Sequence, residues 1–263
     1  MKGDDDMNQS ERRMYLIKEL LNESPRYRDM AVPADSMDQR RLLRSLMNVR
    51  MPAPVSEEFL SVQDEYLRTV TAEKGITKLA DLKPVEKDIY VWQGDITTLE
   101  CGAVVNAANS QMLGCFQPLH SCIDNAIHTY AGIQLRNKCH EIMTAQGHEE
   151  PTGQAKITPA YNLPCKYVLH TVGPIVAGRL SDKERSQLRS SYLSCLELAD
   201  DNGVDSIAFC CISTGVFGFP QLDAARIAVD TVREYKKNGS GIKVIFNVFK
   251  DEDLVIYRGL LGD

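Results

Sequence analysis

An apolar run leads directly into two asparagines in the stretch Val104-Val105-Asn106-Ala107-Ala108-Asn109-Ser110. A short β-branched and apolar run of this kind has the composition of a buried strand. Asparagine is costly to bury without hydrogen-bond partners, so two of them at a strand end predict binding to a ligand, such as a sugar hydroxyl. The alternative is an Asx-type turn, in which the asparagines bond only to nearby backbone.

Similar runs lie on both sides of this stretch. They are Ile89–Gln93, Lys166–Val172, Ser206–Ile212 and Ile242–Phe249, and helical patterns around residues 188–199 and 224–235 alternate with them. Strands that alternate with helices predict an α/β fold with a mainly parallel sheet, in which ligands bind at the carboxyl ends of the strands.

The N-terminal part has a different, purely helical periodicity. Apolar stripes and capping residues predict three helices between Met7 and Gly75, separated by Pro25 and by Pro52-Ala53-Pro54. We therefore divide the chain into a helical extension, residues 1–80, and an α/β domain, residues 81–263. Residues 1–6 are set aside as an expression remnant or a frayed end.

Composition excludes several classes of protein. The 263 residues include 30 Lys and Arg, 36 Asp and Glu and eight Cys, and the formal net charge is −6. There is no apolar run long enough for a membrane span, and the cysteines are too few for a disulfide scaffold, which predicts a reduced, cytoplasmic protein. An acidic surface argues against a nucleic acid polymer, although backbone N–H groups can still hold a small phosphate ligand.

Two more segments follow predicted strands. Ile212-Ser213-Thr214-Gly215-Val216-Phe217-Gly218-Phe219-Pro220 has glycines that let backbone N–H groups approach a phosphate without any Lys or Arg. It is neither a P-loop nor a dinucleotide-binding G-x-G-x-x-G. Gly94-Asp95-Ile96-Thr97 is, taken alone, a common turn.

Together with His170-Thr171-Val172-Gly173-Pro174, these segments resemble a macrodomain, the ADP-ribose-binding α/β/α module, over about Ile89 to Leu261. The resemblance implies a three-layer α/β/α fold with a central mixed, mainly parallel sheet, here preceded by the helical extension. It also implies contacts to ADP-ribose at named positions: Asp95 and Ile96 to adenine, Asn106 and Asn109 to the distal ribose, Ser213, Thr214, Gly215, Val216 and Phe217 to the diphosphate, and Phe249 stacked on adenine.

The sequence departs from the glycine-rich loop of hydrolytic macrodomains of the MacroD type. Residues 114–124 instead present Cys115, His120 and Cys122 with the spacing C-x4-H-x-C. Two thiolates and one imidazole suit zinc, and a three-ligand set beside a ribose pocket is typical of a catalytic site, which keeps a fourth position open. The alternative is one or two buried thiols with a surface imidazole.

The other cysteines have no donor at ligand spacing, so they are interpreted as packing residues. Cys210 and Cys211 are placed within a strand, and Cys139 is placed on a helix beside a surface histidine. His128 and His170 are interpreted as structural hydrogen-bonding residues.

The three-ligand loop makes the chain similar to the zinc-dependent macrodomains, microbial proteins that also carry a helical N-terminal extension. This resemblance implies a gene cluster with a sirtuin-like ADP-ribosyltransferase, and a lipoyl-carrier protein as the modified partner. We therefore expect a zinc-dependent hydrolase that removes mono-ADP-ribose from a protein side chain, an Asp or Glu ester.

Asp124 and Asn109 are the expected catalytic residues, Asp124 to orient a water or accept a proton and Asn109 to hold the ribose hydroxyls. A capping role for Asp124 is the alternative. The competing function is a non-catalytic ADP-ribose reader with a structural zinc. A zinc nucleobase deaminase is excluded because H-x-E with P-C-x-x-C does not occur. The helical extension is expected to flank the cleft and to help select the protein substrate.

Overall fold

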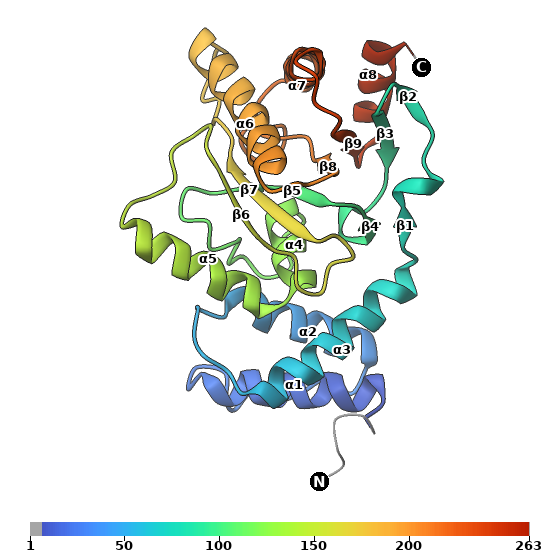
Figure 1. Cartoon of the computed structure of the whole chain (residues 1–263). Helices are drawn as coiled ribbons and strands as arrows, with labels where there is room; N and C mark the ends of the chain where they lie inside the picture. Colours follow the sequence, from blue (N-terminus) through green and yellow to red (C-terminus); the bar gives the residue numbers. More distant parts are fainter. Residues whose placement is uncertain (1–6, 263) are drawn as a thin grey trace.

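The computed structural model describes residues 7–262. Residues 1–6, set aside above, and residue 263 lie outside the described part. Figure 1 shows a bundle of N-terminal helices packed against an α/β unit, in which helices cover both faces of a sheet. Within residues 7–262, no helix is long and apolar enough to cross a membrane.

The bundle consists of α1 (Gln9–Glu23), α2 (Ser36–Val49) and α3 (Glu57–Lys74), which confirms the three predicted helices. Each helix begins at a side chain that accepts hydrogen bonds from the first-turn N–H groups. Asn8 caps α1, Asp35 caps α2 and Ser56 caps α3.

The bundle has an apolar core of its own, formed by residues such as Leu16, Ile17, Leu43 and Val62. This core also includes Ile133, the first residue of α5 (Ile133–Gln146). Helices α2 and α3 both contact α4 (Ile123–Ala131). The bundle is therefore packed directly on the helices that cover one face of the sheet.

The sheet has seven strands. In spatial order they are β2 (Pro84–Glu86), β3 (Ile89–Gln93), β9 (Lys243–Val248), β8 (Ser206–Phe209), β5 (Ala103–Ala108), β7 (Tyr167–Val172) and β6 (Ala155–Pro159). Every pairing from β3 to β7 is parallel, whereas the edge strands β2 and β6 are antiparallel. The predicted mixed, mainly parallel sheet is confirmed.

Helices form a layer on each face of the sheet. One layer contains α6 (Asp182–Asp201), α7 (Gln221–Lys237) and α8 (Asp251–Leu261), and the other contains α4 and α5. The bundle lies on the outer side of α4 and α5 (Figure 1). After α3, the short strand β1 (Thr77–Lys78) pairs with β4 (Leu99–Glu100), and the turn η3 (Ile96–Thr98) contacts both α3 and α4.

Two local predictions differ from the structure. β8 ends at Phe209, so Cys210 and Cys211 lie beyond the strand and not within it. β6 was not predicted, because Ala155–Pro159 is a half-buried edge strand that ends in proline and has no continuous apolar run.

Arg136 of α5 fastens the bundle to the α/β unit. Its Nη1 donates to the carbonyls of Met47 at 3.0 Å, Asn48 at 2.9 Å and Arg50 at 2.6 Å, at the carboxyl end of α2. Its Nε donates to the carbonyl of Leu113 at 2.7 Å. The residue is 5% exposed, so these carbonyls have little access to water once the guanidinium is removed.

We expect Arg136→Met to lower the free energy of unfolding by about 3–5 kcal/mol, because buried carbonyls lose a charged donor. Urea denaturation followed by circular dichroism measures this change. Arg226→Met, at an exposed position of α7, is the matched control and should change stability by no more than about 0.5 kcal/mol. Equal losses in the two variants would contradict the role given to Arg136.

Candidate active site

The segments singled out in the sequence meet at one edge of the sheet. β3, β9, β8 and β5 run parallel, so their carboxyl ends lie at the same edge. Asp95, Phe249, the loop 213–217 and Asn109 each follow one of these ends. A ligand laid across this edge can contact all four.

Asp124 lies in the first turn of α4 and is 5% exposed. Asn106, on β5, donates from Nδ2 to Asp124 Oδ1 over 2.7 Å. Asn109 Nδ2 is 3.4 Å from Asp124 Oδ2 and donates to the carbonyl of Gly114 at 3.1 Å. Burial raises the pKa of Asp124 to about 6, although the bond from Asn106 and the charge of Arg136 act in the opposite direction. Oδ1 thus has a short partner, while Oδ2 keeps capacity for a further donor such as water.

Two buried histidines, His128 and His170, lie on the inner side of the site, and His128 Nε2 is 3.6 Å from Asp124 Oδ1. His170 Nδ1 is 3.2 Å from Asn106 Nδ2, and burial lowers the pKa of His170 to about 3, so its ring is neutral. Neither ring nitrogen of His128 has a hydrogen-bond partner in the described part of the chain. The ligand atoms of His128, Cys139 and His170 lie within 4.8 Å of one another. The prediction that His128 forms hydrogen bonds is therefore wrong. Cys139 has no donor at ligand spacing in the sequence, but the fold brings it close to His128 and His170 from α4 and β7.

Cys115, His120 and Cys122 face one another on the loop before α4. Their ligand atoms lie within 4.8 Å of one another, and Cys115 Sγ is 3.7 Å from His120 Nδ1. Two ligands of a tetrahedral zinc ion are about 3.5–3.8 Å apart, so the loop fits zinc with little movement. All three residues are half-buried. The donor set therefore suits zinc in chemistry and in spacing, and it contributes three ligands.

Helix α2 holds this loop from outside. Arg44 Nη2 donates to the carbonyl of His120 at 3.0 Å and to Asn125 Oδ1 at 2.7 Å. Asn48 Oδ1 accepts from the N–H of Leu119 at 3.0 Å, where the backbone φ is 57°. Because a positive φ is unfavourable for leucine, this bond helps to hold the loop in its observed shape. The helical extension thus helps to support residues 114–124, the ligand loop that carries Cys115, His120 and Cys122.

The loop after β8 presents unpaired backbone donors. In the described chain, nothing accepts a hydrogen bond from the N–H groups of Gly215, Val216 or Phe217. Val216 is 80% exposed. Ser213 has a φ of 65° and lies against Gly173, where an added Cβ would overlap Ser213 Oγ. Such a loop can bind a diphosphate through its backbone, without a cationic side chain.

At the other end of the edge, an acid and an aromatic side chain follow β3 and β9. Phe249 is 76% exposed, so its ring is accessible to a flat ligand. Asp95 Oδ1 accepts from the N–H of Thr97 at 3.0 Å, and its Oδ2 pairs with Lys74 of α3 at 2.8 Å. Burial alone would raise the pKa of Asp95, but the bonds from Lys74 and Thr97 outweigh it and hold the pKa below its ordinary value of 3.8.

Comparisons with known proteins agree with this arrangement. Residues 105–228 match the model of the Macro domain family. The protein-ADP-ribose hydrolase of Treponema medium is 60% identical over 261 residues, which cover 97% of this chain and 100% of that protein. The chain belongs to the macrodomain family.

Two further macrodomain relatives extend the comparison. The protein-ADP-ribose hydrolase of Staphylococcus aureus strain MSSA476 is 52% identical over 93% of this chain and 92% of its own. The Trypanosoma brucei macrodomain in complex with ADP-ribose superposes with a TM-score of 0.65 at 30% identity, covering 83% of this chain and 95% of that chain. The solved macrodomain shows that this fold binds ADP-ribose in that protein.

Among the predicted macrodomain ligand residues, the side chains of Asn106, Ile96 and Ser213 are buried, and the half-buried Thr214 uses its hydroxyl for a backbone bond. Asn106 is fully buried against Asp124, which differs from the expectation that it faces the distal ribose. Ile96 is 2% exposed, and the hydroxyl of Thr214 donates to the carbonyl of Cys211 at 3.0 Å. Ile96 therefore has chiefly its backbone to offer a ligand, and Asn106 acts on the site by positioning Asp124.

Residues of the extension that support the macrodomain site carry no sequence signal. Arg44, Asn48 and Lys74 lie on α2 and α3, far from every motif, and reach the site only in the folded chain. Arg40 and Arg44 are four residues apart on α2, and positive charges with this spacing are typical of any solvated helix face.

We expect Lys74→Met to raise the pKa of Asp95, because burial remains while the hydrogen bond and the charge of Lys74 are lost. A folded-state pKa below the unfolded one contributes stability above the unfolded value, and this contribution disappears as the pH falls through the folded pKa. In the variant this contribution is reduced. Carboxyl ¹³C NMR titration of Asp95 measures the shift, and Lys74→Arg is the control that should keep the low pKa. An unchanged titration in Lys74→Met would contradict the pairing.

Proposed function

We propose that this macrodomain is a zinc-dependent hydrolase that removes mono-ADP-ribose from an aspartate or glutamate ester on a modified protein. The observation that carries the proposal is the three-ligand set of Cys115, His120 and Cys122 on the loop that leads into Asp124. The relatives named protein-ADP-ribose hydrolase, at 60% and 52% identity over nearly the whole chain, support the hydrolytic activity.

Binding energy from the unreactive part of the ligand would position the reacting end. Phe249 and Asp95 lie where they can hold adenine, and the N–H groups of residues 215–217 are available for the diphosphate. The distal ribose would then extend toward Asn109 and the ligand loop. Asn109 lies close to both the loop carbonyl of Gly114 and Asp124.

Asp124 is suited to handle the proton of the attacking water. Its Oδ1 is held by Asn106, so the orientation of the carboxylate is fixed, and Oδ2 can accept the proton. Water then adds across the ester: its hydroxyl joins one side of the broken C–O bond and its proton the other, which releases the free carboxylic acid and ADP-ribose. When bound, zinc would supply Lewis acidity, either on a distal-ribose oxygen or ester carbonyl or by lowering the pKa of a nearby water.

The second candidate is a non-catalytic ADP-ribose reader in which zinc braces the loop. The exposed Phe249 ring and the free N–H groups are sufficient for such binding without any hydrolysis. The reader and the hydrolase share every contact to adenine and diphosphate. They differ only in whether the modified protein is turned over.

Other parts of the resemblance stay predictions. These are the gene cluster with a sirtuin-like transferase and the lipoyl-carrier protein as the modified partner. The cytoplasmic location, which was inferred from composition, also stays a prediction.

Release of free ADP-ribose, followed by mass spectrometry, tests the proposal. We expect release from a protein modified on glutamate and none from the same protein modified on serine or arginine. Calorimetry with free ADP-ribose is the control for an intact binding cleft. Tight binding of ADP-ribose together with no release from any of the three linkages would favour the reader instead.

A further inference from the structure

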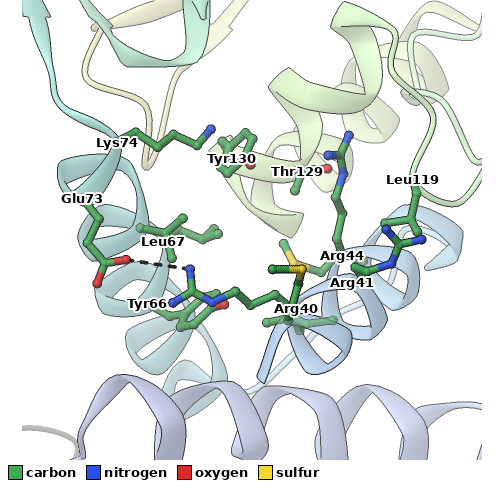
Figure 2. A pocket seen from close by; sticks show the side chains of 14 residues that line it. Arg40, Arg41, Arg44, Tyr66, Leu67, Glu73, Lys74, Leu119, Thr129 and Tyr130 are labelled. Atoms are coloured by element: carbon green, nitrogen blue, oxygen red, sulfur yellow. Dashed lines mark ion pairs between the residues drawn. The ribbon is translucent and has the colours of Figure 1, made fainter. Parts of the chain in front are cut away.

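A cavity of about 710 Å³ lies between the helical extension and α4. Its walls come from α2, α3 and α4, with Leu119 of the ligand loop at one side (Figure 2). Cavities of this size hold ligands in many proteins. Neither Asn109 nor any residue of the loop 213–217 lines it.

The cavity is strongly cationic. Arg40, Arg41, Arg44 and Lys74 line it, and Glu73 is the one acid among the residues that line it. Arg40 Nη1 and Glu73 Oε2 are as far apart as 3.9 Å, and both side chains are half-exposed, so this ion pair is weak. Because Lys74 is paired with Asp95 outside the lining, the three arginines supply the charge that remains against Glu73, in a chain whose net charge is −6.

The cavity also has apolar and aromatic walls. Leu43, Met47, Leu67 and Val70 contribute apolar surface. Tyr130 lies under Lys74, whose Nζ is 3.3 Å from the ring centroid. A ligand that combines carboxylates with apolar side chains would therefore meet matching groups on several sides.

Both ends of the cavity are joined to the candidate active site. Arg44 lines the cavity and donates to the carbonyl of His120 in the ligand loop. Lys74 lines the opposite side and pairs with Asp95 at the predicted adenine end. Figure 2 shows Arg44 and Lys74 on different walls, with the Lys74 ammonium against Tyr130 and the Arg44 guanidinium directed toward α4.

We propose that this cavity binds an acidic segment of the ADP-ribosylated protein. Aspartate and glutamate side chains of that segment pair with the arginines of α2, and an apolar side chain enters between the bundle and α4. The proposal rests on the proposed function, because it gives the modified protein a second point of attachment beside the ligand loop. It also gives the helical extension a role in substrate selection.

The position of the charges favours a protein segment over a small free anion. Arg40 and Arg41 are exposed, so an acidic surface can reach them, whereas Arg44 is half-buried. Exposed charges mainly steer and select large partners. A small anion would need several donors converging on one point, whereas these cations are spread over two walls.

Direct binding of a peptide tests the proposal without any hydrolysis. The probe is a fluorescein-labelled octapeptide that alternates glutamate with leucine, and its matched control replaces each glutamate by glutamine. We expect the full-length wild type to bind the glutamate peptide with an affinity that falls with salt, and Arg41→Glu to weaken this binding about tenfold. Arg41→Lys should retain it, and Arg226→Glu, the same charge change on α7, should leave it unchanged.

Several outcomes would overturn the proposal: equal binding of the two peptides by the wild type, unchanged binding in Arg41→Glu, or displacement of the glutamate peptide by inorganic pyrophosphate at a concentration as low as that of the unlabelled peptide. The last outcome would identify a small-anion site. Because no turnover is measured, failure of this test leaves the proposed hydrolase intact. A wild type that binds the peptide but releases no ADP-ribose would refute only the hydrolase.

Discussion

Cys122→Ala is expected to purify with almost no zinc and to release ADP-ribose from a modified glutamate about 10³-fold more slowly than the wild type, because Lewis acidity is worth several kcal/mol in the transition state. Cys122 is one of three ligands and also caps α4, accepting from the N–H of Asn125 at 3.4 Å. Loss of one of three ligands leaves too few to hold the ion. Affinity for free ADP-ribose should change by no more than about threefold, since adenine and diphosphate bind elsewhere.

Cys101→Ala is the matched control, because this half-buried thiol donates to the carbonyl of Ala103 and belongs to no ligand cluster in the described chain. It should keep both zinc and activity. Elemental analysis measures the zinc content of both variants, and the release assay measures their rate of ADP-ribose release. Equal zinc in Cys122→Ala and the wild type would refute the ligand assignment.

Asp124→Asn is expected to lower kcat by about 10²–10⁴-fold while zinc content and ADP-ribose affinity stay close to wild type. The amide keeps the shape of the side chain and can still accept the hydrogen bond from Asn106, but it cannot take a proton from water. Steady-state kinetics on a protein modified on glutamate measure the loss.

The alternative role of Asp124, as a helix cap or loop brace, predicts a different pattern. In that case Asp124→Asn loses stability or zinc, and activity falls only in proportion. Asp253→Asn, at another buried acid in the first turn of a helix, is the control for a purely structural loss. Full kcat in a stable, zinc-containing Asp124→Asn would remove the catalytic role.

The sequence predicted the fold where local patterns dominate. Runs rich in β-branched or aromatic residues, such as Ala103–Asn106 and Ile242–Phe249, indicated central parallel strands, and side-chain caps such as Asn8 and Ser56 marked helix starts. The edge strand β6 was not predicted, because a half-buried strand has no continuous apolar run. Strand length was also overestimated at β8, where the apolar run continues beyond the last ladder bond into Cys210 and Cys211.

The candidate site was predictable where its residues share one short segment. Cys115, His120 and Cys122 lie within one loop, so their spacing together with the surrounding motifs indicated a shared ion, and the structure brings their ligand atoms together. The cluster of His128, Cys139 and His170 is assembled from three elements, so no spacing in the sequence could indicate it.

Side-chain direction was a second limit on prediction. Asn106 and Asn109 look equivalent in the sequence, yet Asn106 points into the core and Asn109 stays half-buried at the edge. Position 106 lies within the strand, where successive side chains alternate between faces, whereas position 109 follows its end. The support from Arg44 and Lys74 depends on packing between distant helices, which no local motif reports.

The most direct test of the central claim is the rate of ADP-ribose release by metal-free protein titrated with zinc. The account predicts negligible release from a protein modified on glutamate without metal, and activity that rises linearly and reaches its plateau at one zinc per chain. Metal-free protein that hydrolyses the ester at the full rate, with no response to zinc, would contradict it.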